Sequence, residues 1–285
     1  MFKNILCSAA LVIAMGASAT TQAAVVFAED FQAYASGSFL AGQGGWTGDL
    51  AKVNTTPNFA GSLVIDGQDQ AQGIIPDNFS FLHHSLGGPL TPGGVTEFRF
   101  DAFGNSGDLG GSLSHNSAIG FASSATAAAL AYWGPVGDIS SLDPVIFTSG
   151  VEGWIFNAGG LTGNSADREL VLGGFDSVRD FAVVIDGITM EAFGIYDFGS
   201  GPTETTHYAI TAAQISLIDD IGMFFDFRNG NGQTTTPRGR QFVGAQFDNL
   251  VVTDSLAVPE PATFVLLGFG VVGFIYTRPK RDNGV

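Results

Sequence analysis

The sequence predicts an all-β protein, built as a single β-sandwich of the jelly-roll type, and three observations predict it. Short runs of β-branched and aromatic residues recur between turns rich in Gly, Asp, Asn and Ser. Glycine accounts for 40 of the 285 residues, about twice its ordinary share of ~7%. Helical periodicity is weak, and its best candidates, residues 125–131 and 212–217, are about two turns each. Many short strands with almost no helix favour a sandwich over an α/β fold.

The first element, residues 1–23, has the features of a secretory signal peptide. Lys3 gives a positive start, the run 5–15 is uncharged and mostly apolar, and small residues follow it up to Ala23. An apolar signal helix of this length is too short to span a membrane. We expect cleavage near Ala23. Cys7 is the one cysteine in the chain, so cleavage leaves a body without a thiol, a disulfide or a cysteine-bound metal.

The second element, residues 24–257, is the predicted sandwich domain. Examples of strand-like runs between turn residues are Val25–Phe31, Ser62–Ile65, Val95–Phe103, Val151–Phe156, Phe181–Ile185, Ile188–Tyr196, Ile221–Phe227 and Ala245–Thr253. Phe98 and Phe100 fall on one face of their run, and Arg99 and Asp101 on the other, which is the pattern of a half-buried strand. We find no internal repeat or linker that would divide this stretch, so we expect one domain.

The charge of the predicted body excludes some classes of partner. Residues 24–257 hold 7 basic and 25 acidic side chains, a net charge of −18. A nucleic-acid-binding protein needs a face rich in Lys and Arg to neutralise phosphates, so we exclude a nucleic-acid partner. Hydrophobic residues make up 45% of the chain and charged residues only 13%, which excludes a disordered chain.

The third element, residues 258–281, has three parts in order. Residues 258–263, Val-Pro-Glu-Pro-Ala-Thr, contain two prolines, which exclude regular structure at this junction. The apolar run 262–277 then predicts a transmembrane helix of about 24 Å, slightly short of a hydrocarbon core of ~30 Å. The last part is a basic cluster of Arg278, Lys280 and Arg281. Such a cluster stays in the cytoplasm and its long side chains can close the gap in length, so we expect the body outside the cytoplasm.

These three parts resemble the PEP-CTERM sorting tail of exopolysaccharide-producing Gram-negative bacteria, which is also known as an ice-binding protein C-terminal domain without implying ice binding. The resemblance implies that the tail is held in the inner membrane and recognised by an exosortase-type sorting enzyme. Pro259, Glu260 and Pro261 would be the recognition motif. Processing would then release the protein to the cell surface or the extracellular matrix. The alternative is that the tail is only a membrane anchor.

The body resembles the concanavalin A-like lectin and glucanase jelly roll. The segments that carry this resemblance are residues 29–34, 42–46, 184–187 and 246–252. The resemblance implies that the first and last strands are neighbours. It also implies a Ca²⁺ site where they meet, with Glu29 and Asp248 as ligands and carbonyl groups near Gly45. We expect no other cofactor.

We predict no catalytic residues. Glucanases of this fold carry Glu-x-Asp-x-x-Glu on one strand, and none of the glutamates in the body stands in that motif. Glu97 shares a strand face with Arg99 and Asp101, which indicates a charged outer face. The adjacent His83 and His84 would point to opposite faces of a strand, which does not suit one metal ion. The alternative is a secreted glycanase of the same fold, whose carboxylates come from separate strands.

Carbohydrate binding requires exposed aromatic rings beside polar groups, because sugar faces stack on rings while hydroxyls form hydrogen bonds. Trp46, in a glycine-rich loop, and Tyr132 and Trp133, before Gly134, are the candidates for glycan contact. Core packing is the alternative for each tryptophan. The sequence therefore predicts an exported, non-catalytic surface or exopolysaccharide-matrix protein with a structural or glycan-contacting sandwich.

Overall fold

The computed structural model describes residues 23–48, 52–55, 59–66, 79–104, 116–136, 153–174, 177–226 and 245–256. The predicted sorting tail and all but the last residue of the predicted signal peptide lie outside these ranges. Within them, no helix is long and apolar enough to cross a membrane.

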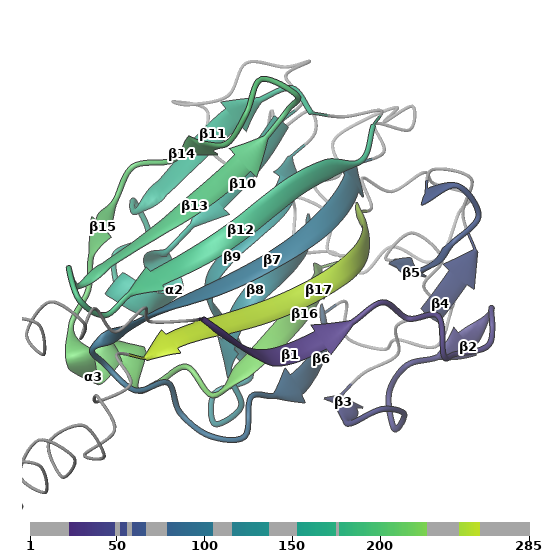
Figure 1. The fold of residues 1–285 in the computed structure, drawn as a ribbon, viewed down its shortest axis with the longest axis horizontal. Helices are drawn as coiled ribbons and strands as arrows, with labels where there is room; N and C mark the ends of the chain where they lie inside the picture. Colours follow the sequence, from purple (N-terminus) through teal and green to yellow (C-terminus); the bar gives the residue numbers. More distant parts are fainter. Residues whose placement is uncertain are drawn as a thin grey trace, which may run out of the picture. The chain divides into compact units, whose positions relative to one another are not determined.

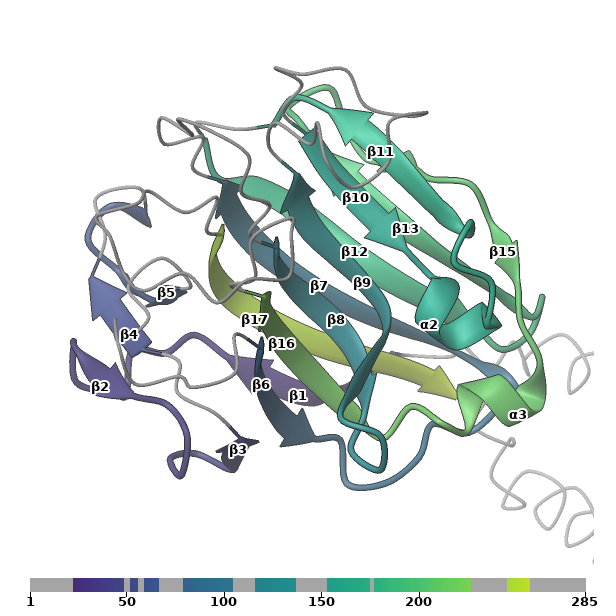
Figure 2. The same ribbon diagram turned by 180° about the vertical axis from the view of Figure 1, so that it is seen from behind.

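Two antiparallel sheets make up the described part of the chain, in agreement with the predicted β-sandwich. Figure 1 shows the larger sheet with β12, β7 and β17 in front, and Figure 2 shows the smaller sheet with β9, β8 and β16 from behind. Among the described residues the larger sheet has ten strands and the smaller has seven. Two helices of one turn, α2 (Gly159–Thr162) and α3 (Ala212–Ile215), complete the described elements.

The larger sheet has the order β14 (Thr203–Glu204), β13 (Glu191–Asp197), β12 (Arg179–Asp186), β7 (Gly94–Gly104), β17 (Ala245–Leu256), β5 (Leu63–Asp66), β4 (Lys52–Thr55) and β2 (Ser38–Phe39). Beside this order, β1 (Ala24–Glu29) pairs with β17, and β15 (Tyr208–Ala209) pairs with β13. The smaller sheet has the order β11 (Arg168–Leu172), β10 (Gly153–Asn157), β9 (Ala128–Val136), β8 (Asn116–Ser123), β16 (Asp220–Asp226), β6 (Phe79–Ser85) and β3 (Trp46–Gly48).

The first and last described strands are neighbours, as the resemblance implies. β1 and β17 are antiparallel, and Glu29 lies opposite Leu250. Figure 1 shows them side by side, in the first and last colours of the described chain. Residues from the two ends of the body therefore meet at one place.

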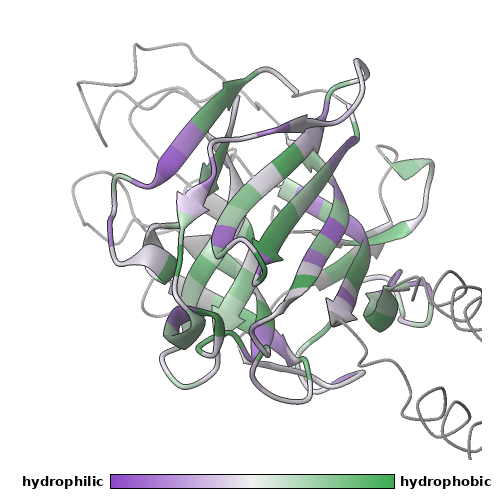
Figure 3. Cartoon of the chain, turned by 60° about the vertical axis from the view of Figure 1, so that its left-hand side comes forward, coloured by the Kyte–Doolittle hydropathy of each residue, from purple (hydrophilic) through white to green (hydrophobic). Residues whose placement is uncertain are grey.

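The core lies between the two sheets and is formed by alternate residues of the strands. Phe98 and Phe100 of β7 are fully buried, while Arg99 between them is exposed, as the period-2 pattern predicts. Figure 3 shows the same alternation as hydrophobic and hydrophilic bands along the strands. Trp133 of the smaller sheet joins the layers, because its Nε1 donates a hydrogen bond of 2.8 Å to the carbonyl oxygen of Ala182 in the larger sheet. Burial of this aromatic interior is the main source of stability.

One predicted helix forms and the other does not. α3 forms within 212–217, where the Thr211 hydroxyl accepts a hydrogen bond from Gln214 N and the Gln214 side chain accepts one from Thr211 N. The predicted helix at 125–131 is wrong, because residues 124–127 form a turn and β9 begins at Ala128. The helix propensity of an alanine-rich stretch is a weak preference, which pairing between β8 and β9 overrides here.

Candidate functional site

One row of residues crosses the smaller sheet from β3 to β9. Thr47 of β3 lies opposite His83 of β6, and Gly222 of β16 lies opposite His83 on its other side. Gly120 of β8 comes next, followed by Tyr132 of β9. Residues directly opposite one another on neighbouring strands share a face, so these five positions form one line across the sheet. We call them the outer row.

The outer row looks away from the core. Trp46, Met223 and Trp133, each next to a member of the outer row in sequence, are buried in the central hydrophobic cluster. Side chains alternate between the two faces along a strand, so the members of the row point to the opposite side. The outer row therefore lies on the face of the smaller sheet turned away from the central core, where Phe81 and Phe224 belong to a second buried cluster.

Three hydrogen-bonded side chains occupy the β3 end of this face. His83 Nδ1 contacts Asp220 Oδ2, and His83 Nε2 lies 3.0 Å from Thr47 Oγ1. The side chain of Asp220 is 3% exposed and that of His83 is 23% exposed, whereas Thr47 is exposed at the surface. We call these residues the Thr47–His83–Asp220 chain. It leads from a buried carboxylate through an imidazole to a surface hydroxyl.

The buried carboxylate sets the roles of the two imidazole nitrogens. An ionised Asp220 is only an acceptor, so Nδ1 of His83 carries the proton and donates it. In the tautomer with its proton on Nδ1, His83 Nε2 accepts a hydrogen bond from the Thr47 hydroxyl. Burial raises the pKa of Asp220, and the hydrogen bond from His83 opposes this rise.

A line of aromatic rings connects His83 with Tyr132. The His83 ring stacks on Phe81 with centroids 4.8 Å apart, and Phe81 stacks on Phe224 at 4.7 Å. The Phe224 ring lies 6.4 Å from Tyr132. Gly222 permits this arrangement, because a Cβ atom there would come within 2.6 Å of the Phe81 ring. Phe81 and Phe224 are buried, at 7% and 6% exposure, so these rings form a packed apolar strip with a polar group at each end.

The structure separates the three aromatic residues predicted to contact a glycan. Trp46 and Trp133 are buried, at 1% and 0% exposure, so the prediction of a surface role for them is corrected in favour of core packing. Each tryptophan occupies a position of its strand whose side chain points into the core. Tyr132 points to the outer face and is partly exposed, and burial raises the pKa of its hydroxyl. Of the three, Tyr132 alone has the orientation that stacking on a sugar requires.

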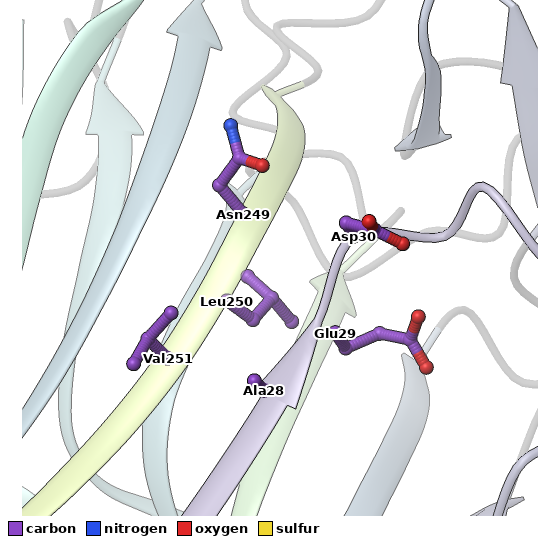
Figure 4. A pocket seen from close by; sticks show the side chains of 6 residues that line it. All are labelled: Ala28, Glu29, Asp30, Asn249, Leu250 and Val251. Atoms are coloured by element: carbon purple, nitrogen blue, oxygen red, sulfur yellow. The ribbon is translucent and has the colours of Figure 1, made fainter. Parts of the chain in front are cut away.

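Glu29 and Asp248, the predicted calcium ligands, come together where β1 meets β17. A shallow pocket of about 260 Å³ opens there, lined by Ala28, Glu29, Asp30, Asn249, Leu250 and Val251. Figure 4 shows the Glu29 and Asp30 carboxylates extending away from β17. The two Glu29 oxygens already accept hydrogen bonds of 2.8 Å, one from Phe31 N and one from the Tyr34 hydroxyl.

Asp248 is buried beside other carboxylates. It is 4% exposed, and its Oδ1 accepts a hydrogen bond of 2.8 Å from Asn249 N. Burial raises the pKa of Asp248 to about 6, and the charges of Asp101, Asp30 and Glu29 add to this rise. Ca²⁺ takes six to eight oxygen ligands. In the part of the chain that the structure describes, no three His, Cys, Asp or Glu side chains form a group that could hold a metal ion. The Ca²⁺ site, which includes carbonyl groups, stays a prediction.

The outer face of the larger sheet is charged, as predicted for Glu97, Arg99 and Asp101. Arg99 Nη2 lies 2.8 Å from Glu97 Oε1. Asp101 lies opposite Asp180 on the neighbouring strand, and its Oδ2 accepts a hydrogen bond of 2.7 Å from Asn249 Nδ2. Burial raises the pKa of Asp101, and the neighbouring Asp180 also raises it.

The remaining described histidines have other partners. His84 points to the opposite face from His83, as predicted, where its ring centroid is 5.4 Å from that of Trp46. His207 lies between two carboxylates, with Nδ1 3.0 Å from Glu191 Oε2 and Nε2 3.2 Å from Glu204 Oε2. The hydrogen bond to Glu191 raises the pKa of His207. Neither ring contacts a side-chain hydroxyl among the contacts of the described residues.

Sequence reasoning missed the Thr47–His83–Asp220 chain. Its members are 36 and 137 residues apart and stand in no recognisable motif. The alternation of side chains along a strand predicts that His83 and His84 point to opposite faces. It does not predict which strands pair with theirs, so it could not identify Thr47 or Asp220 as partners.

The predicted sorting residues Pro259, Glu260 and Pro261 and the basic cluster Arg278, Lys280 and Arg281 lie outside the described residues. They are nevertheless covered by a family comparison. Residues 257–281 match the PEP-CTERM protein-sorting motif. This motif is a sorting signal for exosortase-type processing, and it implies an exported protein whose sorting involves membrane anchoring.

Several solved structures are similar to the chain. The basic winged bean lectin with Tn-antigen has 10% identity and a TM-score of 0.47, covering 82% of this chain and 99% of its own. The endo-1,3-β-glucanase from Streptomyces sioyaensis has 10% identity and a TM-score of 0.49, with coverage of 81% and 96%. The lectin from Bauhinia forficata in complex with GalNAc has 12% identity and a TM-score of 0.44, with coverage of 82% and 98%. A comparison with curated proteins finds no match.

Proposed function

We propose that this protein is an exported surface or exopolysaccharide-matrix protein, sorted through its PEP-CTERM tail, whose β-sandwich has a structural or glycan-contacting role. The match of residues 257–281 to the sorting motif carries the proposal. In this proposal an exosortase-type enzyme recognises Pro259, Glu260 and Pro261 while the tail is held in the inner membrane. The body is then released to the cell surface or the surrounding matrix. Its net charge of −18 is compatible with a hydrated or cation-bridged matrix.

The sandwich, in this proposal, contacts glycans without cleaving them. Tyr132 offers a partly exposed ring on the outer face, next to the buried Phe224 ring. Rings beside hydrogen-bonding groups suit a sugar.

Replacing Pro259, Glu260 and Pro261 together by alanine should stop processing. The uncleaved precursor should then accumulate in the membrane fraction of a host that carries an exosortase, because the enzyme loses its recognition motif while the apolar run remains. Immunoblots of membrane and extracellular fractions measure this. Pro279→Ala is the matched control, since it changes a proline of the same tail outside the motif, and it should be processed normally. If the triple variant had the same size and location as the unchanged protein, the tail would be only a membrane anchor.

Tyr132→Ala should weaken glycan binding about tenfold, which corresponds to about 1.4 kcal/mol for the lost stacking contact. A glycan array with the full-length protein identifies the ligand, and titration of both proteins measures the change. Tyr208→Ala is a suitable control, because Tyr208 stacks on the core residue Phe156 rather than standing in the outer row. If the Tyr132 variant and the unchanged protein bound the glycan with equal affinity, Tyr132 would not be the residue that contacts it. If the unchanged protein binds no glycan, only the structural role remains.

A further inference from the structure

The Thr47–His83–Asp220 chain has the order of groups that activates a nucleophile. In such a site a carboxylate orients an imidazole through Nδ1, and Nε2 accepts the proton of a hydroxyl. We propose that Thr47 is a nucleophile, His83 its general base and Asp220 the positioning residue, and that this face hydrolyses carboxylic esters. This activity goes beyond the proposed glycan contact and does not depend on it.

The geometry separates this arrangement from an ordinary surface hydrogen bond. Thr47 Oγ1 has two acceptors on His83, and the ring nitrogen at 3.0 Å is closer than the carbonyl oxygen at 3.5 Å. The hydroxyl is at the surface, while the carboxylate at the other end is almost fully buried. A reactant can therefore reach the hydroxyl, and water is kept from the group that orients the base.

Two other polar groups of the body each lack one member of the Thr47–His83–Asp220 chain. His207 contacts two carboxylates, and no hydroxyl hydrogen-bonds to its ring in the described contacts. The Ser124 hydroxyl donates a hydrogen bond of 2.5 Å directly to Asp219 Oδ2, with no imidazole between them. Each has part of the set, whereas the Thr47–His83–Asp220 chain has all three groups in order.

The neighbourhood of Thr47 leaves space for an ester. β3 is the outermost strand of the smaller sheet, so Thr47 is at an edge that no further described strand covers. Thr47 itself is exposed at this edge. The Phe81 ring stacks on His83 and is buried, so it supports the imidazole of the base by packing.

The reaction is balanced with water as the only co-reactant. The Thr47 Oγ proton moves to His83 Nε2 as Oγ bonds to the carbonyl carbon of the ester. The tetrahedral intermediate then breaks the bond to the alcohol, which leaves with the proton from Nε2. Water then gives a proton to the same nitrogen and attacks the carbonyl carbon of the acyl-threonine. The second tetrahedral intermediate breaks its bond to Thr47 Oγ, which takes the proton back from Nε2, and the carboxylic acid is released.

The test uses the full-length protein with p-nitrophenyl acetate and with a fluorophosphonate, which labels activated hydroxyl nucleophiles. We expect ester hydrolysis and a label on the peptide that contains Thr47. Thr47→Val and His83→Gln should lower hydrolysis at least about 100-fold and abolish the label, because a general base contributes 10²–10⁴-fold. Asp220→Asn should lower kcat with KM unchanged. Thr47→Ser restores a hydroxyl at this position and should recover hydrolysis relative to Thr47→Val, which would show that the loss in Thr47→Val comes from the missing hydroxyl and not from misfolding.

His207→Gln is the matched control, since it removes a histidine that also contacts carboxylates. It should leave hydrolysis and labelling unchanged. Circular dichroism establishes that each variant is folded. The proposal is overturned if the folded, unchanged protein neither hydrolyses the ester nor takes the label, or if Thr47→Val retains both. A loss of glycan binding in Tyr132→Ala, with hydrolysis intact, would leave the proposal standing and shows that the two functions fail independently.

Discussion

Replacing Trp133 by alanine should lower the free energy of unfolding by about 3–5 kcal/mol, the range for removing a buried large aromatic side chain. Trp133 is fully buried, and its ring centroid lies 5.1 Å from that of Phe181 and 5.5 Å from that of Phe156. Its Nε1 donor also joins the two sheets through Ala182. The substitution thus leaves a cavity in the core and breaks a bond between the layers. Urea denaturation followed by tryptophan fluorescence and circular dichroism measures the change.

Tyr132→Ala is the natural comparison, because it changes the next residue on the opposite face of the same strand. It should cost less stability than Trp133→Ala. The two substitutions therefore separate the two roles that the sequence left open for aromatic residues at this place. If Trp133→Ala kept the stability of the unchanged protein and lost only ligand binding, the core role of this ring would be wrong.

Asp248→Asn should stabilise the protein at neutral pH, by up to about 3 kcal/mol, since each unit of pKa difference corresponds to 1.36 kcal/mol. The pKa of Asp248 is raised from 3.8 to about 6, so the folded protein holds the proton more tightly than the unfolded chain. Stability from this group is greatest below about pH 3.8 and falls as the pH rises to about 6. The amide has no charge to bury and can still accept the hydrogen bond from Asn249 N.

Denaturation at pH 5 and pH 7.5 measures this effect away from the isoelectric point of about 4.3. Over this interval the unchanged protein should lose about 1 kcal/mol more stability than Asp248→Asn. Asp220, another carboxyl group with a raised pKa, contributes to both proteins and cancels in the difference. The same pH dependence in both proteins would contradict the prediction.

The same two proteins test the predicted calcium site. If Ca²⁺ binds at Glu29 and Asp248, adding it in place of a chelator at pH 7.5 raises the unfolding midpoint of the unchanged protein, because a ligand of the folded state stabilises it. Asp248→Asn should lose that rise. An equal midpoint with Ca²⁺ and with chelator would remove the site from this face of the molecule.

The fold was predictable where its signal is local. Period-2 alternation placed Phe98 and Phe100 inside and Arg99 outside, and the structure has them so. The alanine-rich stretch at 125–131 was predicted wrongly, because its local preference for helix is weaker than the pairing of β9 with β8. Trp46 shows the same limit, since a residue at the end of a glycine-rich loop has no alternating pattern before it from which its face can be predicted.

The sequence by itself was enough to identify the sorting signal of this protein. The sorting motif at 257–281 is a contiguous string, and it is recognisable without the fold. The sequence also determined the β class and the acidic, cysteine-free body, because these follow from composition and short-range pattern. Only the tertiary structure decided which side chains meet. Thr47, His83 and Asp220 come from three strands far apart in the chain, and their contact depends on strand order and register. Those are set by the packing of the whole sandwich, because a shift of one residue in register would turn each side chain to the other face.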